Sequence, residues 1–399
     1  MDGDTAVSGA AVFSDLVGQE RVVAQLEQAT SVAARLLRGE RVLGMTHAWL
    51  FTGPPGSGRS VAARAFAAAL LCPDQGCGHC PSCHQVRAGT HPDLLLVKPE
   101  GLSYGVRQTR DLVLRAAGAP SGGRWQVVVF EDADRATEQA ANALLKAIEE
   151  PAPRTVWLLC APSAEELVTT IRSRCRLVTL RTPPPEAVAE VLTRRDGVDP
   201  ARALAAARAA QGHVGRAKRL ATDPEAAQRR AEVLRIPARI TSLGTALSAA
   251  AGLVKAAEQE AASVTEELNT PERDALRKAF GEGSTGKGVA KAVRGSAGAM
   301  KELEDRQKSR ATRLKRDALD RALLDLAAFY RDVLVVQLGA DMDLSSAGHE
   351  EELRRLAAAS APESTVRRME AIMTCRERLE LNVAPLLAAE EMTLALLAG

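Results

Sequence analysis

The sequence predicts an α/β domain with a parallel sheet, followed by helical domains. A short apolar strand leads directly into a glycine-rich loop and a helix within residues 46–72. Further apolar strands alternate with helices as far as residue 185, and strands that are apolar on both faces are typical of a parallel sheet. After three prolines at 183–185 no convincing strand appears. We therefore expect a domain boundary at these prolines.

The predicted elements of the α/β domain follow one another in chain order. Residues 13–37 predict a loop and then a helix with apolar residues at helical spacing. Residues 46–72 predict the strand, the glycine loop and the next helix. Residues 124–151 predict a strand that ends in acidic residues, followed by a helix that stops before Pro151. Two more strands are expected within residues 154–162 and 171–185.

Beyond these strands the pattern predicts only helices. Short helices separated by Gly and Pro predict a small helical domain at 186–235, and an all-α domain follows at 236–399. Residues 268–300 are polar and contain several glycines, so this segment is expected to be partly mobile. Residues 316–339 predict an amphipathic helix with a wide apolar face.

Composition and charge limit the classes of function. The 399 residues are too many for one compact core, and the 46% hydrophobic content is ample for several. The 52 basic and 50 acidic residues nearly cancel, so the net charge gives no general signal for nucleic acid or membrane. The chain begins without a secretory pattern and contains no apolar run of about 18 residues. We expect a soluble, cytoplasmic protein.

The glycine-rich loop predicts a nucleotide site. It consists of Gly53, Pro54, Pro55, Gly56, Ser57, Gly58, Arg59 and Ser60. Backbone N–H groups of such a loop surround phosphate oxygens, and the following helix adds its positive end. The expected ligand is ATP or ADP, with the Ser60 hydroxyl on Mg²⁺. Arg59 replaces the usual lysine, and its bulkier planar group favours phosphate binding over hydrolysis.

The acidic end of the strand at 127–130 forms the second half of this predicted site. Working sites of this type carry Asp and then Glu, for Mg²⁺ and for the attacking water, whereas this chain has Glu131 and then Asp132. Each side chain differs by one methylene group, and a displacement of about 1 Å can cost a hundredfold in rate. A solvent-facing acidic strand end is the alternative interpretation.

Four cysteines, Cys72, Cys77, Cys80 and Cys83, lie within twelve positions after the glycine loop. Four thiolates at this spacing can complete a tetrahedral zinc site, which would be structural because no position stays open. An iron–sulfur cluster and a redox dithiol are the alternatives.

These motifs together resemble the AAA+ subunits of the bacterial DNA polymerase III clamp loader. The resemblance rests on the segments 15–29 and 47–60, the four cysteines, HPDL at 91–94, NALLKAIEEP at 142–151 and SRC at 173–175, which occur in this order in that family. It implies a P-loop AAA+ domain with an inserted zinc module (1–185, cysteines at 72–83), a small helical lid domain (186–235) and an all-α collar domain for oligomerisation (236–399).

The resemblance also implies roles for residues outside the loop. Arg174 would be an arginine finger that acts in trans on the ATP site of a neighbouring motor subunit. Val17 and Gly18 would lie against the adenine, and Arg216 would sense phosphate. In the family, the strand at 154–162 normally presents Thr or Asn toward the γ-phosphate, whereas Ala161 and Pro162 occupy that place here, with Ser163 next to it.

Two kinds of family member carry all these features, an ATP-hydrolysing motor and a stator. Arg59 and the Glu131–Asp132 order favour the stator, with weak ATPase activity or none. The implied partners are motor subunits, a delta subunit, the sliding clamp and primed DNA through the complex. The alternatives are the motor itself and, in a different class, a zinc-dependent DNA-binding module. The cysteine segment has few basic residues, which argues against the latter.

Overall fold

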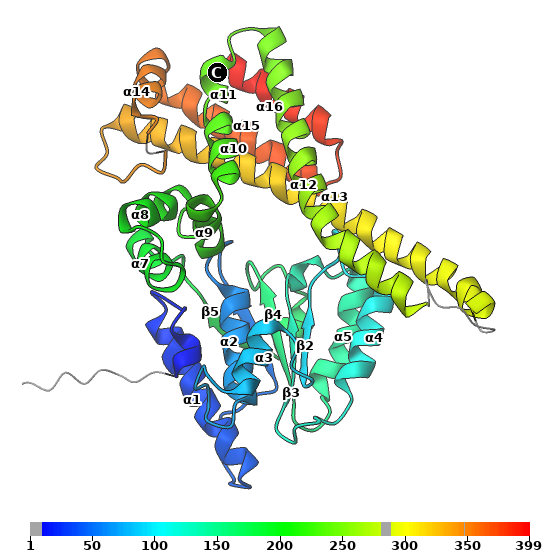
Figure 1. The fold of residues 1–399 in the computed structure, drawn as a ribbon. Coiled ribbons are helices and arrows are strands. Elements are labelled where there is room, and N and C mark those ends of the chain that lie inside the picture. The colour runs from blue at the N-terminus through cyan, green and yellow to red at the C-terminus, as the bar shows by residue number, and fades with distance from the viewer. Residues whose placement is uncertain (1–9, 281–288, 347) are drawn as a thin grey trace, which may run out of the picture. The chain divides into compact units, whose positions relative to one another are not determined.

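The computed structural model of the protein describes residues 10–280, 289–346 and 348–399 (Figure 1). The chain divides into two compact units, Met1–Pro99 with Ser103–Ala221 and Glu100–Leu102 with Thr222–Gly399. The predicted three-domain division remains a prediction. Within the described ranges, no helix is both long enough and apolar enough to cross a membrane.

A parallel sheet forms the centre of the first unit and confirms the predicted α/β class. In the described residues it has five strands in the order β2-β3-β4-β1-β5. These are β1 (Ala48–Thr52), β2 (Leu94–Val97), β3 (Gln126–Phe130), β4 (Thr155–Ala161) and β5 (Arg176–Thr179). The register is parallel throughout, with Leu50 opposite Leu159 and Val128 opposite Trp157. The sequence analysis predicted four of these strands and missed β2.

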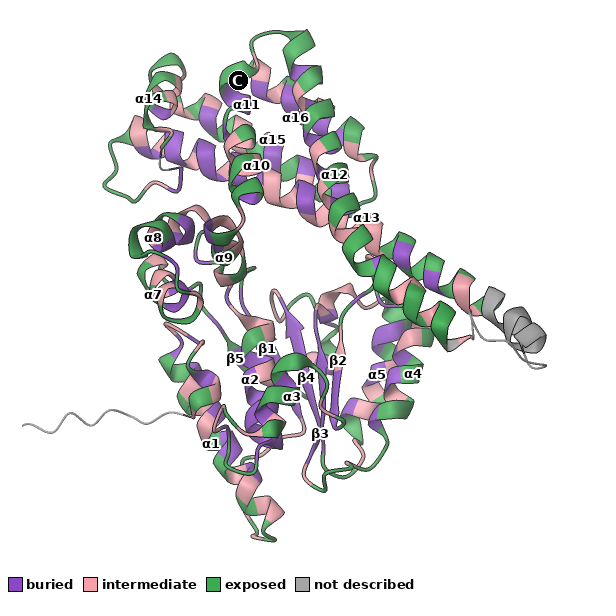
Figure 2. Cartoon of the chain, viewed as in Figure 1, coloured by how far each residue is buried: buried purple, intermediate pink, exposed green. Residues whose placement is uncertain are grey.

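Both faces of the sheet are covered, as Figure 2 shows by the buried colour of the strands. Alternate residues of one strand enter different cores, because successive side chains point to opposite faces. Trp49 and Phe51 join the core that contains Phe66 of helix α2 (Arg59–Leu71). Leu50 joins the core on the other face, with Leu144 of helix α5 (Glu138–Glu149).

The other helices of the first unit complete these layers or lie after the sheet. They are η1 (Ala11–Phe13), α1 (Glu20–Leu37), α3 (Pro81–Ala88), α4 (Val106–Ala116), η2 (Ala133–Arg135), α6 (Thr169–Arg172), α7 (Pro185–Asp196), α8 (Pro200–Ala209) and α9 (Val214–Thr222). Helices α7, α8 and α9, hereafter the α7–α9 group, enclose a small core of their own around Val188, Leu192 and Ala207. The predicted short helices after the prolines are confirmed.

The second unit is helical throughout its described residues, which confirms the mostly helical C-terminal part. Its helices are α10 (Pro224–Leu234), α11 (Ile236–Arg239), α12 (Leu243–Ala279), α13 (Val289–Leu338), α14 (Glu350–Ala359), α15 (Pro362–Glu380) and α16 (Pro385–Ala398). Leu253, Leu323, Ile372 and Met392, from four of these helices, meet in one core. The predicted amphipathic helix at 316–339 is the C-terminal half of α13.

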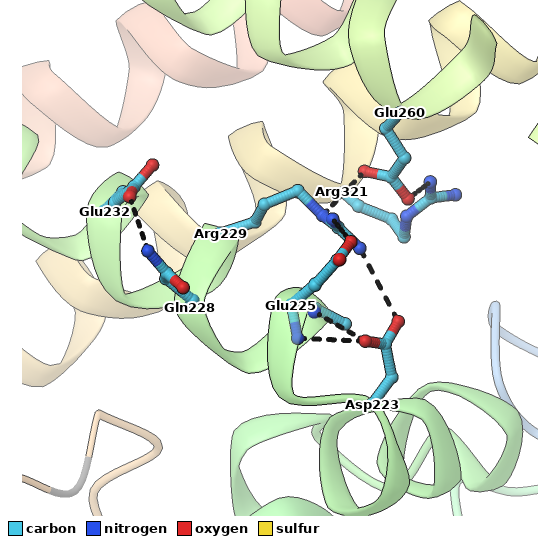
Figure 3. A network of polar contacts seen from close by, with 8 residues as sticks. Asp223, Glu225, Gln228, Arg229, Glu232, Glu260 and Arg321 are labelled. Atoms are coloured by element: carbon cyan, nitrogen blue, oxygen red, sulfur yellow. Dashed lines mark hydrogen bonds and ion pairs between the residues drawn. The ribbon is translucent and has the colours of Figure 1, made fainter. Parts of the chain in front are cut away.

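A network of charged residues fixes α10 against the two long helices (Figure 3). Asp223 caps α10 by accepting hydrogen bonds from the backbone N–H groups of Glu225 and Ala226, at 2.9 and 3.2 Å. Arg229 of α10 pairs with Asp223 and, at 3.7 Å, with Glu260 of α12. Glu260 also pairs with Arg321 of α13 at 2.8 Å. The carboxylate of Glu260, which is largely buried, therefore joins three helices.

Helix α12 continues through residues 268–279, in the segment for which the composition predicted partial mobility. Pro271 lies inside the helix, although it cannot donate a backbone hydrogen bond. Asn269 and Gln307 are buried between α12 and α13, and the Gln307 amide donates to the Asn269 carbonyl. Arg310 of α13 pairs with Glu272 at 2.7 Å. Polar contacts of this kind specify how two helices align. Residues 281–288 lie outside the described residues.

Candidate functional site

The predicted phosphate loop is the turn between β1 and α2. Gly56 and Gly58 both have a φ of 90°. This value lies in the left-handed region, which residues other than glycine rarely adopt. The Gly53 N–H donates to the carbonyl of Pro162, which ties the loop to the end of β4. Gly58 is the N-cap residue of α2, so Arg59 and Ser60 occupy the first turn. The backbone of this loop has the form that phosphate binding needs.

A cavity of about 340 Å³ opens beside this loop. Its walls come from the segment before α1, the loop and first turns of α2, the end of β3, the residue Pro183, and the α7–α9 group. The lining residues are Asp15, Leu16, Val17, Gln19, Gly56, Ser57, Gly58, Arg59, Ser60, Val61, Arg64, Glu131, Pro183, Arg195, His213, Val214 and Gly215. Cavities of this size hold small-molecule ligands.

The α7–α9 group closes the cavity through direct contacts. A Cβ atom placed on Gly56 would lie 2.6 Å from the Cβ of His213, so only glycine fits there. The His213 ring accepts a hydrogen bond from the Arg216 N–H at Nδ1, at the beginning of α9. Arg195 pairs with Asp196 at 2.9 Å and with Asp15 at 3.4 Å. These contacts hold helices α7 and α9 against the loop and the segment before α1.

The acidic end of β3 is engaged by cations. The two oxygens of Glu131 lie 3.8 Å from Arg64 Nε and 3.6 Å from Lys98 Nζ. The Arg64 Nε also donates to the Ser60 carbonyl at 3.2 Å. Asp132 has a left-handed backbone (φ 50°), and it does not line the cavity. Tyr104 holds the strand end, since its hydroxyl donates to the Glu131 carbonyl at 2.5 Å.

Three polar side-chain atoms in the cavity wall are buried and have no hydrogen-bond partner among the described residues. They are Ser57 Oγ, Arg59 Nη1 and Glu131 Oε1. Ser57 is only 2% exposed. A buried polar atom without a partner is costly, so a polar ligand is the simplest explanation for Ser57 Oγ and Arg59 Nη1, whereas Glu131 Oε1 already faces Arg64 at 3.8 Å.

Burial has an electrostatic effect next to this wall. It raises the pKa of the Asp134 carboxyl, as does the charge of Asp132, whereas Arg59 opposes the shift. Arg59 therefore contributes positive charge near the acidic residues that follow β3, as well as at the beginning of α2.

The structure brings many of the predicted nucleotide-site residues together. Those that line the cavity are Val17, Gly56, Ser57, Gly58, Arg59, Ser60 and Glu131. Those that do not line it are Gly18, Gly53, Asp132 and Arg216. Gly53 and Gly18 shape the backbone near the cavity, with φ values of 150° and 68°.

Sequence reasoning missed the residues that reach the cavity from elsewhere in the chain. Arg64 lies four residues after Ser60 on the same helix, a spacing that places both on one face and could have revealed it. Arg195 and His213 belong to the α7–α9 group, and no local pattern marks them. Lys98, which pairs with Glu131 but does not line the cavity, follows the strand that the sequence analysis did not predict.

Arg174 lies at the end of α6 and does not line this cavity. Its side chain is 39% exposed and pairs with Glu149 of α5 at 2.6 Å. It also donates to the Thr170 carbonyl at 2.7 Å. Within the isolated chain, Arg174 thus takes part in a surface ion pair.

The four predicted cysteines form one cluster, and their sulfur atoms lie within 4.8 Å of one another. The Cys72 Sγ lies 3.7 Å from that of Cys77 and 3.6 Å from that of Cys80. Four sulfurs at about 2.3 Å from a tetrahedral zinc would be about 3.8 Å apart. The backbone N–H of His79 lowers the pKa of Cys77 to about 6, whereas burial raises the pKa of Cys80 and Cys83. The cluster could hold a metal ion.

A parallel sheet, a glycine loop between β1 and α2 and a cavity beside that loop define the class of protein. They are the features of nucleotide-binding α/β domains with a phosphate loop. Comparisons with known proteins narrow this class. The model of a family described as "DNA polymerase III, delta subunit" matches residues 28–184.

Individual relatives agree with this match. DNA polymerase III subunit delta′ of Pseudomonas aeruginosa is 41% identical over 165 residues, which are 40% of this chain and 50% of the relative. Subunit gamma/tau of Mycobacterium tuberculosis is 35% identical over 190 residues, 46% of this chain and 31% of the relative. The chain spans about half the length of the curated delta′ relatives it matches.

One solved structure is similar over most of the chain. It is a DNA polymerase III gamma subunit-related protein of Thermotoga maritima, 15% identical, with 92% of this chain and 98% of that chain covered and a TM-score of 0.39. At that score it adds nothing to the fold described above. The sequence matches support the resemblance: residues 28–184 match the family model, and parts of this chain are 37–41% identical to DNA polymerase III delta′ subunits.

The contact between the loop and the α7–α9 group can be tested with two glycine variants. Gly56→Ala and Gly58→Ala impose the same strained φ of 90°, but nothing lies within 4 Å of a Cβ at Gly58. We expect Gly56→Ala to lower the free energy of unfolding by about 1–3 kcal/mol more than Gly58→Ala, because it also collides with His213. Denaturant unfolding of both variants without nucleotide measures this difference. Equal losses would contradict the contact.

Proposed function

We propose that this chain is a delta-prime stator subunit of a DNA polymerase III clamp loader. In this role it assembles with motor subunits and a delta subunit, and the complex loads the sliding clamp onto primed DNA. The family match over residues 28–184 carries the proposal, because it spans the phosphate loop, the cysteine cluster and the Arg174 segment. The helices of the second unit would serve as the collar.

The chemistry of the nucleotide cavity favours a stator over a motor. Arg59 stands where a motor has lysine, and the carboxylate of Glu131 already faces Arg64 and Lys98. Pro162, where the family presents a polar side chain, offers only its carbonyl, which accepts from Gly53. The cavity would bind ATP or ADP and hydrolyse it slowly or not at all. The similarity to gamma/tau subunits keeps the motor as the second candidate.

Arg174 would act on the ATP of a neighbouring motor subunit. A guanidinium group stabilises the charge that develops on a γ-phosphate in hydrolysis. The pair of Arg174 with Glu149 joins two half-exposed side chains, 39% and 42% exposed. Such pairs contribute about 1 kcal/mol or less, so a phosphate can readily take the place of Glu149.

The cysteine cluster would hold a structural Zn²⁺ ion through Cys72, Cys77, Cys80 and Cys83. The sulfur–sulfur distances fit a tetrahedral thiolate site, and the metal would supply no chemistry beyond fixing the segment between α2 and α3. Cys80 also caps α3, since its sulfur accepts from the Cys83 N–H.

Replacement of Arg174 by Ala tests the proposed function. We expect Arg174→Ala to lower the DNA-stimulated ATPase activity of the reconstituted clamp loader, because the adjoining motor site would lose about 10³-fold or more in rate. Co-purification with the motor and delta subunits should be unchanged. Arg172→Ala, at the last residue of α6 and two positions before Arg174, is the matched control and should leave the ATPase activity intact.

Two outcomes would count against the proposal. Unchanged ATPase activity in Arg174→Ala would remove the finger assignment alone. Failure of the wild-type chain to assemble with motor and delta subunits would overturn the stator role.

Metal analysis tests the zinc assignment. We expect about one zinc per purified chain, and a marked loss of zinc in Cys80→Ser, whose hydroxyl can still cap α3 but is a poor zinc ligand. The control Cys175→Ser changes a half-buried thiol outside the cluster and should retain the metal. Elemental analysis gives the content. Iron with inorganic sulfide, or no metal in freshly purified protein, would contradict the assignment.

A further inference from the structure

The strongest unexplained feature of the nucleotide cavity is the position of Arg64. Its Nε donates to the carbonyl of Ser60 and lies 3.8 Å from a carboxylate oxygen of Glu131. Ser60 and Glu131 are the two residues that a phosphate-loop site would use to hold Mg²⁺. A guanidinium group therefore stands beside the Glu131 carboxylate and the backbone carbonyl of Ser60.

The second oxygen of Glu131 faces another cation, Lys98, at 3.6 Å. Glu131 is thus engaged on both sides by positive charge. Mg²⁺ requires near-ideal octahedral oxygen coordination and gives up its water reluctantly. It would have to approach a carboxylate already flanked by two cations, which repel it. The Mg²⁺ that the loop pattern implies does not fit these residues.

The same cations suit the phosphate groups of a nucleotide. Arg59 begins α2 with one guanidinium nitrogen buried and without a hydrogen-bond partner among the described residues, and Ser57 Oγ in the same wall is also unsatisfied. Arg64 lines the cavity one turn further along the helix. Guanidinium groups and helix N-termini both bind phosphate oxygens without help from a metal.

We infer that this cavity binds a nucleoside di- or triphosphate without a divalent cation, with Arg64 in the place that Mg²⁺ takes in hydrolysing sites. The inference rests on the proposed nucleotide site. It adds that arginine side chains, and not Mg²⁺, neutralise the negative charge of the phosphates there. Without Mg²⁺ beside the terminal phosphate the site retains its ligand but lacks the metal that would promote phosphoryl transfer. Nucleotide would then stabilise the loop and the α7–α9 group.

Calorimetric titration of the full chain with ADP, in EDTA and in excess Mg²⁺, tests this inference. We expect the dissociation constant in EDTA to be equal to or lower than that in Mg²⁺, because Mg²⁺ competes with Arg64 for the same phosphate oxygens. An affinity that rises about tenfold or more with Mg²⁺ would overturn the inference. ATP should behave in the same way.

Variants identify the cation responsible. Arg64→Ala should weaken ADP binding in EDTA about tenfold or more, as the loss of a charged hydrogen bond does, and Mg²⁺ should restore part of it. Lys98→Ala removes a half-exposed side chain and should also make binding more responsive to Mg²⁺. Arg110→Ala, on the exposed side of α4, is the control and should bind ADP as the wild type does.

The outcomes separate this inference from the proposed function. If ADP binds in neither buffer, or if Arg64→Ala binds ADP in EDTA as tightly as the wild type, the inference is wrong. Either result would leave the stator role standing, since assembly with the motor and delta subunits is measured independently.

Discussion

The turn from β1 to α2 is the constraint on which the rest of the candidate site depends. Gly53, Gly56 and Gly58 have positive φ values, and side chains on the first two would collide with neighbouring atoms. The collision at Gly56 would be with His213, so the close approach of α9 depends on the absence of a side chain in the loop. One backbone conformation thus forms the phosphate-binding turn and allows the α7–α9 group to close the cavity.

The charges around this turn explain how a site could bind a nucleotide without hydrolysing it. Arg59 supplies positive charge at the beginning of α2, and Arg64 and Lys98 engage the acid that would otherwise hold a metal. Phosphate binding needs cations and N–H donors, both of which the cavity retains. Hydrolysis also needs an ion and a water held in place. Under the proposed function, this chain would hold a nucleotide that it does not hydrolyse, while the neighbouring motor subunits hydrolyse theirs.

Short sequence patterns predicted those features whose residues are close together in the chain. The glycine loop, the acids after β3 and the cysteine cluster each lie within a short segment, so spacing alone revealed them. Contacts such as Glu131 with Arg64, Gly56 with His213 and Asp15 with Arg195 join segments far apart in the sequence. They become visible only when the sheet order brings their elements together. The strand β2 was missed because only its first residue, Leu94, was singled out, as the last residue of the HPDL motif.

Composition was least informative in the second unit. Partial mobility of residues 268–300 stays a prediction, and within that segment α12 continues to Ala279 despite Pro271. The partners of its polar residues lie on α13, where Gln307 and Arg310 contact Asn269 and Glu272. Polarity indicates disorder only when such partners are absent, and a single segment cannot reveal them.

The central claim is that the cavity retains nucleotide without hydrolysing it. The most direct measurement is a single-turnover experiment with labelled ATP and an excess of the purified chain, in Mg²⁺. The account predicts that the ATP bound to the chain is recovered intact over times in which a motor subunit turns over. Conversion to ADP by the chain alone, abolished in Arg59→Ala, would contradict it and identify the protein as a motor.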